Sequence, residues 1–317
     1  MIFSWQVPQW EQLRRLHREA RLPHALLFMG PEGVGKRHLA RILAGLVLCQ
    51  QPDITAGQAC GHCHACHLMQ ADSHPDFALV QPEEEGHAIK IDQIRELSEF
   101  IQKTSHQGGF QVVIIQPATA MNTYTANALL KTLEEPSPQT LIILISDKRS
   151  ELPVTITSRC QQIRFSRPSQ ATSLSWLQAQ DSTVDWEPIL EATQGSPLLS
   201  QMWQQQGIWA QYQNFMRDLN ALSQQTVDPL QLALQWKDAN MLWIFDMFFH
   251  WLQKLLRMQL EPTQENISSN EGFSSASLFE FIDYLKQMRA EVSGPYNLNQ
   301  QLMLESLFIR WVQYVSR

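Results

Sequence analysis

The sequence predicts an α/β fold of the P-loop type, a parallel sheet with helices on both faces, followed by an all-helical region. Short apolar runs alternate with helical patterns over roughly the first 165 residues. A glycine-rich loop follows the first of these runs directly and reads Gly30-Pro31-Glu32-Gly33-Val34-Gly35-Lys36. Beyond Pro168 strand patterns stop, and from about residue 208 Leu, Trp and Gln recur at helical spacing.

The first part is expected to hold five strands and four helices. The strands are predicted at 25–29, 77–80, 111–115, 141–145 and 162–165, where short apolar runs lie between polar or turn residues. The helices are predicted at 8–20, at 36–49, from 91 with Asp92 as N-cap, and at 122–135, where Pro136 ends the last one.

The remaining residues are predicted to be helical. Residues 169–205 form a small helical unit in this interpretation, and a longer helical region starts at 208, with a loop at 261–275. The longer region contains closely spaced aromatic residues, namely Trp243, Phe245, Phe248, Phe249 and Trp251. Such residues can stack on nucleic-acid bases, but this spacing on a helix is more typical of a packed core.

Composition and charge exclude some classes of function. A chain of 317 residues suggests two or three domains. Since no apolar run is long enough to cross a bilayer and no signal-peptide pattern is present, we expect a cytoplasmic protein without membrane contact. The net charge of −7 argues against an autonomous DNA-binding protein, because neutralisation of phosphates by Lys and Arg supplies most non-specific affinity.

The glycine-rich loop predicts a phosphate-binding site that lacks one part. In such a loop the backbone at Gly30, Gly33 and Gly35 cradles phosphates, and Lys36 reaches the β- and γ-phosphates. The next position normally carries a hydroxyl that binds Mg²⁺, but here it is Arg37, which has no lone pair for a metal. Weak ATP binding stays open, whereas hydrolysis is not expected.

Four of the five cysteines, Cys49, Cys60, Cys63 and Cys66, lie close together in the sequence. Their spacing permits a closed tetrahedral Zn²⁺ site, which would be structural because no coordination position stays open. Disulfides are disfavoured without a secretion signal, whereas an iron–sulfur cluster also suits such spacing. Three neighbouring histidines are alternative ligands: His62, His64 and His67. A nucleic-acid-reading zinc module is disfavoured, since residues 50–75 contain no Lys or Arg.

Two further runs are highly specific: residues 126–136 read ANALLKTLEEP, and residues 152–160 read LPVTITSRC. With the cysteine insertion, they resemble bacterial clamp-loader subunits of the AAA+ family, closely over the first 165 residues and loosely beyond. The resemblance implies a AAA+ domain at 1–166 with a zinc module at 49–66, a helical lid at 167–207, and a helical collar at 208–317. It also implies partners: the ATPase subunits and delta subunit of a hetero-pentameric ring and, through that ring, the sliding clamp and primer–template DNA.

Departures from the family's ATPase pattern favour a non-hydrolysing subunit. An ATPase of this family has an acidic pair after the third strand, where this chain has Gln116-Pro117. Its lid usually carries an Arg that senses the phosphates, where this chain has Leu198 and Leu199. The alternative is a weakly active P-loop ATPase of the same assembly, which would need a carboxylate near the end of the third strand.

The motif Ser158-Arg159-Cys160 resembles the family motif whose arginine reaches ATP bound to a neighbouring subunit. Arginine suits this role because its planar fork stays charged and binds oxyanions bidentately. Spacing alone leaves an ion pair with Glu134, or a cap on the sheet edge, as an equal alternative; the resemblance favours the finger in trans. Cys160 is expected to be a small buried residue, since no His lies near it in the sequence.

Overall fold

The computed structural model describes residues 1–53, 56–84, 86–107, 109–147, 152–260, 275–292 and 299–315. Two compact units divide the chain, Met1–Met202 and Trp203–Arg317. The predicted loop at 261–275 lies outside the described residues, except that Ser275 begins a helix.

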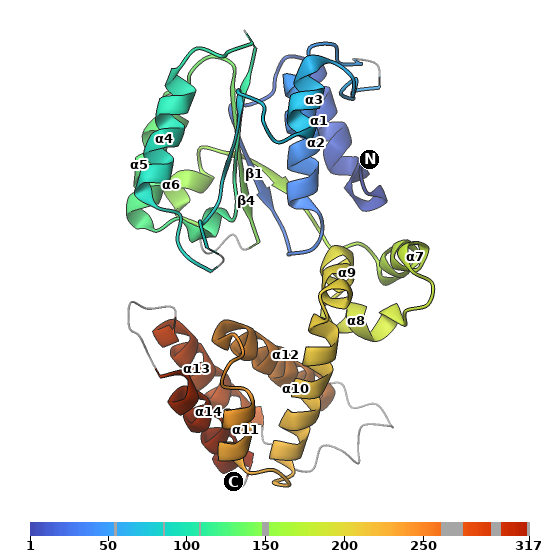
Figure 1. Ribbon diagram of the computed structural model, residues 1–317, viewed down its shortest axis with the longest axis vertical. Helices are drawn as coiled ribbons and strands as arrows, with labels where there is room; N and C mark the ends of the chain where they lie inside the picture. Colours follow the sequence, from blue (N-terminus) through green and yellow to red (C-terminus); the bar gives the residue numbers. More distant parts are fainter. Residues whose placement is uncertain are drawn as a thin grey trace. The chain divides into compact units, whose positions relative to one another are not determined.

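The first unit contains a five-stranded parallel sheet (Figure 1). Its strands are β1 (Ala25–Met29), β2 (Phe77–Val80), β3 (Gln111–Ile115), β4 (Thr140–Ser146) and β5 (Gln161–Arg164). They lie in the order β2-β3-β4-β1-β5. β1, β3 and β4 are buried along their whole length, as expected for parallel strands covered on both faces. All five predicted strands are therefore confirmed, with ends that differ by at most one residue.

Helices cover both faces of this sheet (Figure 1). One face carries α1 (Val7–Arg18), α2 (Lys36–Leu48) and α3 (His64–Gln70), and the other carries α4 (Ile91–Gln102), α5 (Thr123–Glu134) and α6 (Val154–Thr157). Successive side chains of β1 enter opposite cores, because strand side chains alternate: Leu26 and Phe28 pack with Leu39 of α2, and Leu27 packs with Leu129 of α5. The predicted α/β fold class is confirmed.

The start of α4 corrects one prediction. Its N-cap is Lys90 and not Asp92. The Gln93 side chain accepts a hydrogen bond from the Lys90 backbone N–H (2.9 Å), and Asp92 lies in the first turn, where it pairs with Arg95 (2.9 Å). A carboxylate in the first turn interacts favourably with the helix dipole. Asp92 therefore does mark the start of this helix, but as its second residue and not as its N-cap.

Three short helices complete the first unit and confirm the helical region predicted at 169–205. They are α7 (Gln170–Gln180), α8 (Trp186–Ala192) and the first residues of α9 (Pro197–Gln205). Ser169 caps α7, since its hydroxyl accepts a hydrogen bond from the Thr172 backbone N–H (3.2 Å).

The described residues of the second unit form helices joined by short turns. It contains the last residues of α9 and five complete helices: α10 (Ile208–Ser223), α11 (Pro229–Gln235), α12 (Met241–Leu260), α13 (Ser275–Val292) and α14 (Gln300–Val315). Phe248 is fully buried, and its ring packs edge-on against Phe281 (5.3 Å between centroids) and Trp311 (5.5 Å). Phe245 and Trp251 are buried as well, so these aromatic residues form a core, as predicted.

In the described part of the chain, no helix is both long and apolar enough to span a membrane.

Candidate functional site

The glycine-rich loop lies at the carboxyl end of β1, the strand between β4 and β5. Gly30 leaves the strand at Met29, and α2 begins at Lys36. A side chain at position 30 would not fit, because its Cβ would lie 2.2 Å from the Phe165 carbonyl oxygen. Gly35 is the N-cap of α2 with φ of +86°, a left-handed conformation that glycine adopts without strain. The sequence pattern therefore predicted the loop and its backbone shape correctly.

The Lys36 side chain is fully engaged by the protein itself. The side chain is 4% exposed, and its ammonium group donates to the carbonyl oxygens of Gly30 (2.7 Å) and Pro31 (2.6 Å). It also donates to a carboxylate oxygen of Asp147, at 2.6 Å. An ammonium group has three N–H donors, so these contacts use all of them.

Sequence reasoning missed Asp147. It is the residue directly after β4, which lies between β1 and β3 in the sheet. The register pairs Met29 with Ser146, which places Asp147 beside the start of the loop. An acidic residue directly after β4 predicts a carboxylate beside the loop only when the order of the strands in the sheet is known.

The N-terminal segment covers one side of the loop. The Gln6 side-chain amide donates to the carbonyl oxygens of Val34 (2.9 Å) and Gly35 (2.8 Å), and the Trp5 indole N–H also donates to Val34 (3.1 Å). The rings of Phe3 and Trp5 are stacked, with centroids 4.8 Å apart. Trp176 of α7 packs edge-on against both rings, at 5.6 Å from each, so the helical region after the sheet joins this cover.

Helix α9 approaches the loop from another direction. The Leu198 backbone N–H donates to the Gly33 carbonyl oxygen (3.1 Å). A Cβ at Gly33 would lie 2.6 Å from the Leu199 Cβ, so these two residues are in close contact. Leu199 therefore presents an apolar side chain to the loop, where the ATPase pattern usually has a phosphate-sensing arginine.

The residues at the predicted metal positions offer no ligand of the expected kind. Arg37 is exposed at the start of α2. Gln116 follows β3 directly, and its side-chain oxygen is buried without a hydrogen-bond partner in the described part of the chain. Neither Gln116 nor Pro117 can act as a general base at neutral pH. The one carboxylate shown here to contact the loop, that of Asp147, is bound to Lys36.

Arg159 follows α6, on the opposite face of the sheet from α2. Its guanidinium group donates to the Thr155 carbonyl oxygen (3.0 Å) and forms an ion pair with Glu134 at the end of α5 (2.5 Å). The ion pair is the structural alternative that spacing had left open. The Arg159 side chain is nevertheless 36% exposed, so the group remains accessible to another molecule.

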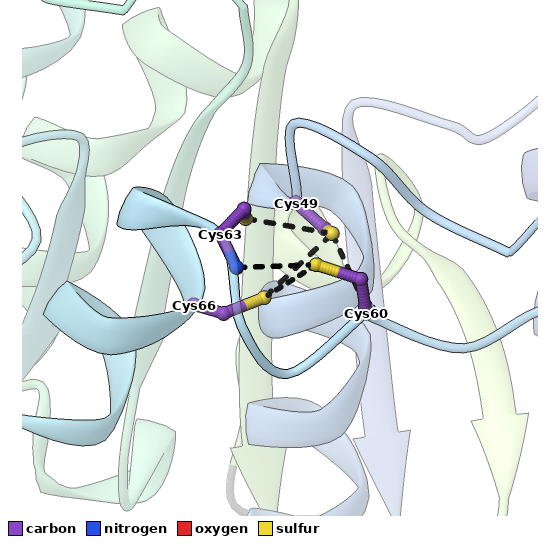
Figure 2. A group of neighbouring side chains, drawn as sticks. All are labelled: Cys49, Cys60, Cys63 and Cys66. Carbon is purple, nitrogen blue, oxygen red and sulfur yellow. Dashed lines mark hydrogen bonds between the residues drawn. The ribbon is translucent and has the colours of Figure 1, made fainter.

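The structure brings the four predicted metal ligands together (Figure 2). Cys49 ends α2, Cys60 and Cys63 lie in the following loop, and Cys66 lies in α3. The sulfur atoms of Cys49 and Cys63 are 3.9 Å apart, those of Cys60 and Cys66 3.9 Å, and those of Cys49 and Cys66 3.6 Å. All four lie within 4.8 Å of one another.

This geometry fits a tetrahedral metal site. With Zn–S bonds of about 2.3 Å, the sulfur atoms of a regular tetrahedron are about 3.8 Å apart. A disulfide needs about 2.05 Å, so the observed separations exclude disulfides in this arrangement. None of the three candidate histidines belongs to the cluster found among the described residues; His62 instead bonds to the Cys60 carbonyl oxygen (2.8 Å).

The surroundings of the sulfur atoms favour the thiolate form at Cys63 and oppose it at Cys66. The backbone N–H of Cys60 donates to the Cys49 sulfur, and that of Cys63 donates to the Cys60 sulfur, each at 3.3 Å. Burial raises the pKa of the Cys66 thiol to about 12. Burial also acts to raise the pKa of Cys63, but N–H groups of Cys66 and Gln50 outweigh it and lower that pKa to about 6. A bound cation would favour the thiolate form of all four.

The cysteine module is attached to the helices beside it by polar contacts. The Arg14 guanidinium group of α1 donates to the Ala56 carbonyl oxygen (2.9 Å), and Arg41 of α2 forms an ion pair with Asp72. The fifth cysteine, Cys160, is separate from this module and buried, and burial raises its pKa to about 12. The prediction of an unreactive buried thiol agrees with these findings.

Comparisons with known proteins agree over nearly the whole chain. The family model described as "DNA polymerase III, delta subunit" matches residues 5–169, and "DNA polymerase III, delta subunit, C terminal" matches residues 206–313. The protein "DNA polymerase III subunit delta'" of Pseudomonas aeruginosa is 38% identical, with 98% of this chain and 97% of that protein covered. The protein of the same name from Haemophilus influenzae is 32% identical over 96% of this chain and 94% of that protein.

Among solved structures, a "gamma subunit-related protein" of DNA polymerase III from Thermotoga maritima matches with a TM-score of 0.48 and 18% identity, covering 96% of this chain and 99% of that one. The identities and coverage of the delta' relatives carry the assignment. The chain belongs to the DNA polymerase III subunit delta' family.

Proposed function

We propose that the chain acts as the non-hydrolysing delta' subunit of the DNA polymerase III clamp loader and supplies Arg159 to ATP bound by a neighbouring ATPase subunit. Family membership supports the place in the polymerase assembly. In this role the chain is not an enzyme alone. Its partners are the ATPase subunits and the delta subunit of a five-membered ring and, through that ring, the sliding clamp and primer–template DNA.

The single observation that carries the non-hydrolysing role is the engagement of Lys36. A P-loop ATPase needs this amine at the β- and γ-phosphates. Here its donors meet two carbonyl oxygens and the Asp147 carboxylate. Gln6 and Leu199 cover the loop from two directions, and Arg37 offers no lone pair for Mg²⁺. Each of these features opposes hydrolysis by a different physical route.

A weakly active ATPase remains the second candidate, and one observation favours it. Asp147 places a carboxylate beside the loop, where no acidic residue was expected from the sequence. To act in hydrolysis, this carboxylate would have to hold Mg²⁺ or orient water. It is instead paired with the lysine that the reaction also needs, so we prefer the non-hydrolysing role.

Steady-state ATP turnover by the isolated chain separates these two candidates. We expect no turnover above background from the wild-type chain, and no change on Lys36→Ala. Turnover by the wild-type chain that Lys36→Ala abolishes would establish the ATPase instead. The use of the lysine variant guards against hydrolysis by a trace contaminant, which this substitution would not affect.

The proposed finger rests on the Ser-Arg-Cys motif and on the exposure of Arg159. In the isolated chain Glu134 and the Thr155 carbonyl oxygen hold the guanidinium group. On assembly, phosphate oxygens of the neighbouring ATP would replace Glu134 as its anionic partner. Since the Arg159–Glu134 pair is partly exposed to water, breaking it costs little free energy and opposes the binding of Arg159 to ATP only weakly.

We also propose that Cys49, Cys60, Cys63 and Cys66 hold one structural Zn²⁺. Three sulfur separations close to that of a regular tetrahedron support this assignment, together with the grouping of all four sulfur atoms within 4.8 Å. For the domains we propose a AAA+ domain at 1–166, a lid at 167–207 and a collar at 208–317 that braces the ring.

A further inference from the structure

The ion pair between Lys36 and Asp147 lies where a phosphate-binding loop would hold its phosphates. Lys36 begins α2 directly after the glycine-rich loop, and Asp147 directly follows the neighbouring strand β4. Their side chains meet at 2.6 Å although the residues are 111 positions apart in the sequence. The contact therefore depends on the sheet order, which sets the ends of β1 and β4 side by side.

The burial of the amine makes a counter-charge necessary. The Lys36 side chain is 4% exposed, and an unpaired ammonium group is costly to bury. In a working phosphate loop the bound phosphates provide the negative charge. Here the groups that face the amine are two loop carbonyl oxygens and one carboxylate, so Asp147 alone among them carries that charge.

We propose that Asp147 is an internal ligand of the loop: its carboxylate takes the place of a phosphate at Lys36 and keeps external anions out. Removal of the carboxylate should open a site for a phosphate-type oxyanion, with inorganic pyrophosphate as the simplest probe. This goes beyond the absence of hydrolysis, because it explains how the loop keeps its shape without a nucleotide. It is also independent of Arg159 and of the ring.

Two further features make the opened position accessible and suitable for an anion. The Asp147 side chain is 43% exposed, so the space that it vacates is continuous with solvent. In the described part of the chain, the backbone N–H groups of Gly33, Val34 and Gly35 have no hydrogen-bond acceptor. Such N–H groups before a helix are the donors that phosphate loops offer to oxyanions.

Thermal unfolding of the full chain with and without pyrophosphate, in metal-free buffer at matched ionic strength, tests the proposal. We expect no pyrophosphate-dependent rise in Tm for the wild type. Asp147→Ala should unfold at a lower temperature, because it leaves a buried ammonium group unpaired. Pyrophosphate should raise its Tm by about 3–6 °C at ten times the dissociation constant. The double variant Asp147→Ala with Lys36→Met should lose this response.

Two more variants keep the test decisive. Asp147→Asn retains the shape and one acceptor oxygen but removes the charge, so it should fold and still respond to pyrophosphate. Asp72→Ala removes a more exposed carboxylate that pairs with Arg41 on the same helix, and should not respond. The proposal is overturned if the wild type responds as strongly as the Asp147 variants, if neither Asp147 variant responds, or if the double variant still responds.

Discussion

Replacement of Cys60 by Ser gives a direct test of the proposed zinc site, with Cys160→Ser as a matched control. Both variants exchange one thiol for a hydroxyl, but Cys60 lies in the four-sulfur cluster and Cys160 does not. Three of the sulfur separations, at 3.6–3.9 Å, match the roughly 3.8 Å of a zinc tetrahedron, and all four sulfur atoms lie within 4.8 Å of one another, so the site is largely formed before the metal binds. The wild type and Cys160→Ser should therefore each hold one equivalent of zinc.

The size of the effect follows from known structural zinc sites. Zinc-finger peptides bind Zn²⁺ with about 10–16 kcal/mol at pH 7, or dissociation constants from tens of nanomolar to about 1 pM. If four ligands share this energy equally, the loss of one costs about 2.5–4 kcal/mol and weakens binding about 10²–10³-fold. Cys160→Ser should leave the affinity unchanged, although a hydroxyl at that buried position costs about 1–3 kcal/mol of stability.

Elemental analysis after reducing, chelator-free purification measures the metal content, and competition with a chromogenic chelator measures the affinity. Less than half an equivalent of zinc in the wild type, or iron in its place, would refute the assignment. So would a Cys60→Ser variant that binds zinc as tightly as Cys160→Ser, since the four sulfur atoms would then not be the ligands.

Three further predictions concern other parts of the first unit. In a reconstituted loader, Arg159→Ala should leave ring assembly intact and remove an arginine finger worth about 10³–10⁵ in rate at one interface, so total ATP turnover should fall without reaching zero. Arg159→Lys should restore little of this turnover, because a lysine cannot bind oxyanions bidentately. Unchanged turnover of the Arg159→Ala loader would leave Arg159 a structural residue. Gly33→Ala, at φ of +72° and against Leu199, should lower Tm by about 4–8 °C, whereas Gly45→Ala, where a Cβ meets nothing within 4 Å, should raise it slightly; equal effects would contradict this reasoning. Asn122→Ala removes the cap of α5 and should cost about 1 kcal/mol in denaturant unfolding.

The sequence was most informative where the fold buries whole segments. β1 and β3 were predicted to the residue, because a parallel strand covered on both faces appears as an unbroken apolar run. The helices α3 and α6 were not predicted. With seven and four residues, they are too short to show a helical repeat, and their surroundings determine them: Met69 of α3 packs into the core beside α2.

The candidate sites were predictable to different degrees. The clustering of the four cysteines was predicted correctly, since three of them lie within seven residues and the fourth ends the preceding helix; their role as metal ligands stays a prediction. Asp147 was not predicted, because its proximity to Lys36 arises from the order of strands in the sheet and has no local signature. The Glu134–Arg159 pair was foreseen only as an alternative, because spacing does not show which of two partners a surface arginine takes.

The glycines of the phosphate loop have structural reasons to be glycine even without a nucleotide. A Cβ at Gly30 would collide with the Phe165 backbone, one at Gly33 with Leu199, and one at Gly35 with the Gln6 amide at 2.7 Å. Each glycine thus permits a different segment of the chain to approach the loop closely. A match to this motif therefore predicts the shape of the backbone, while the side chains around it decide whether a phosphate or the protein's own carboxylate meets the lysine.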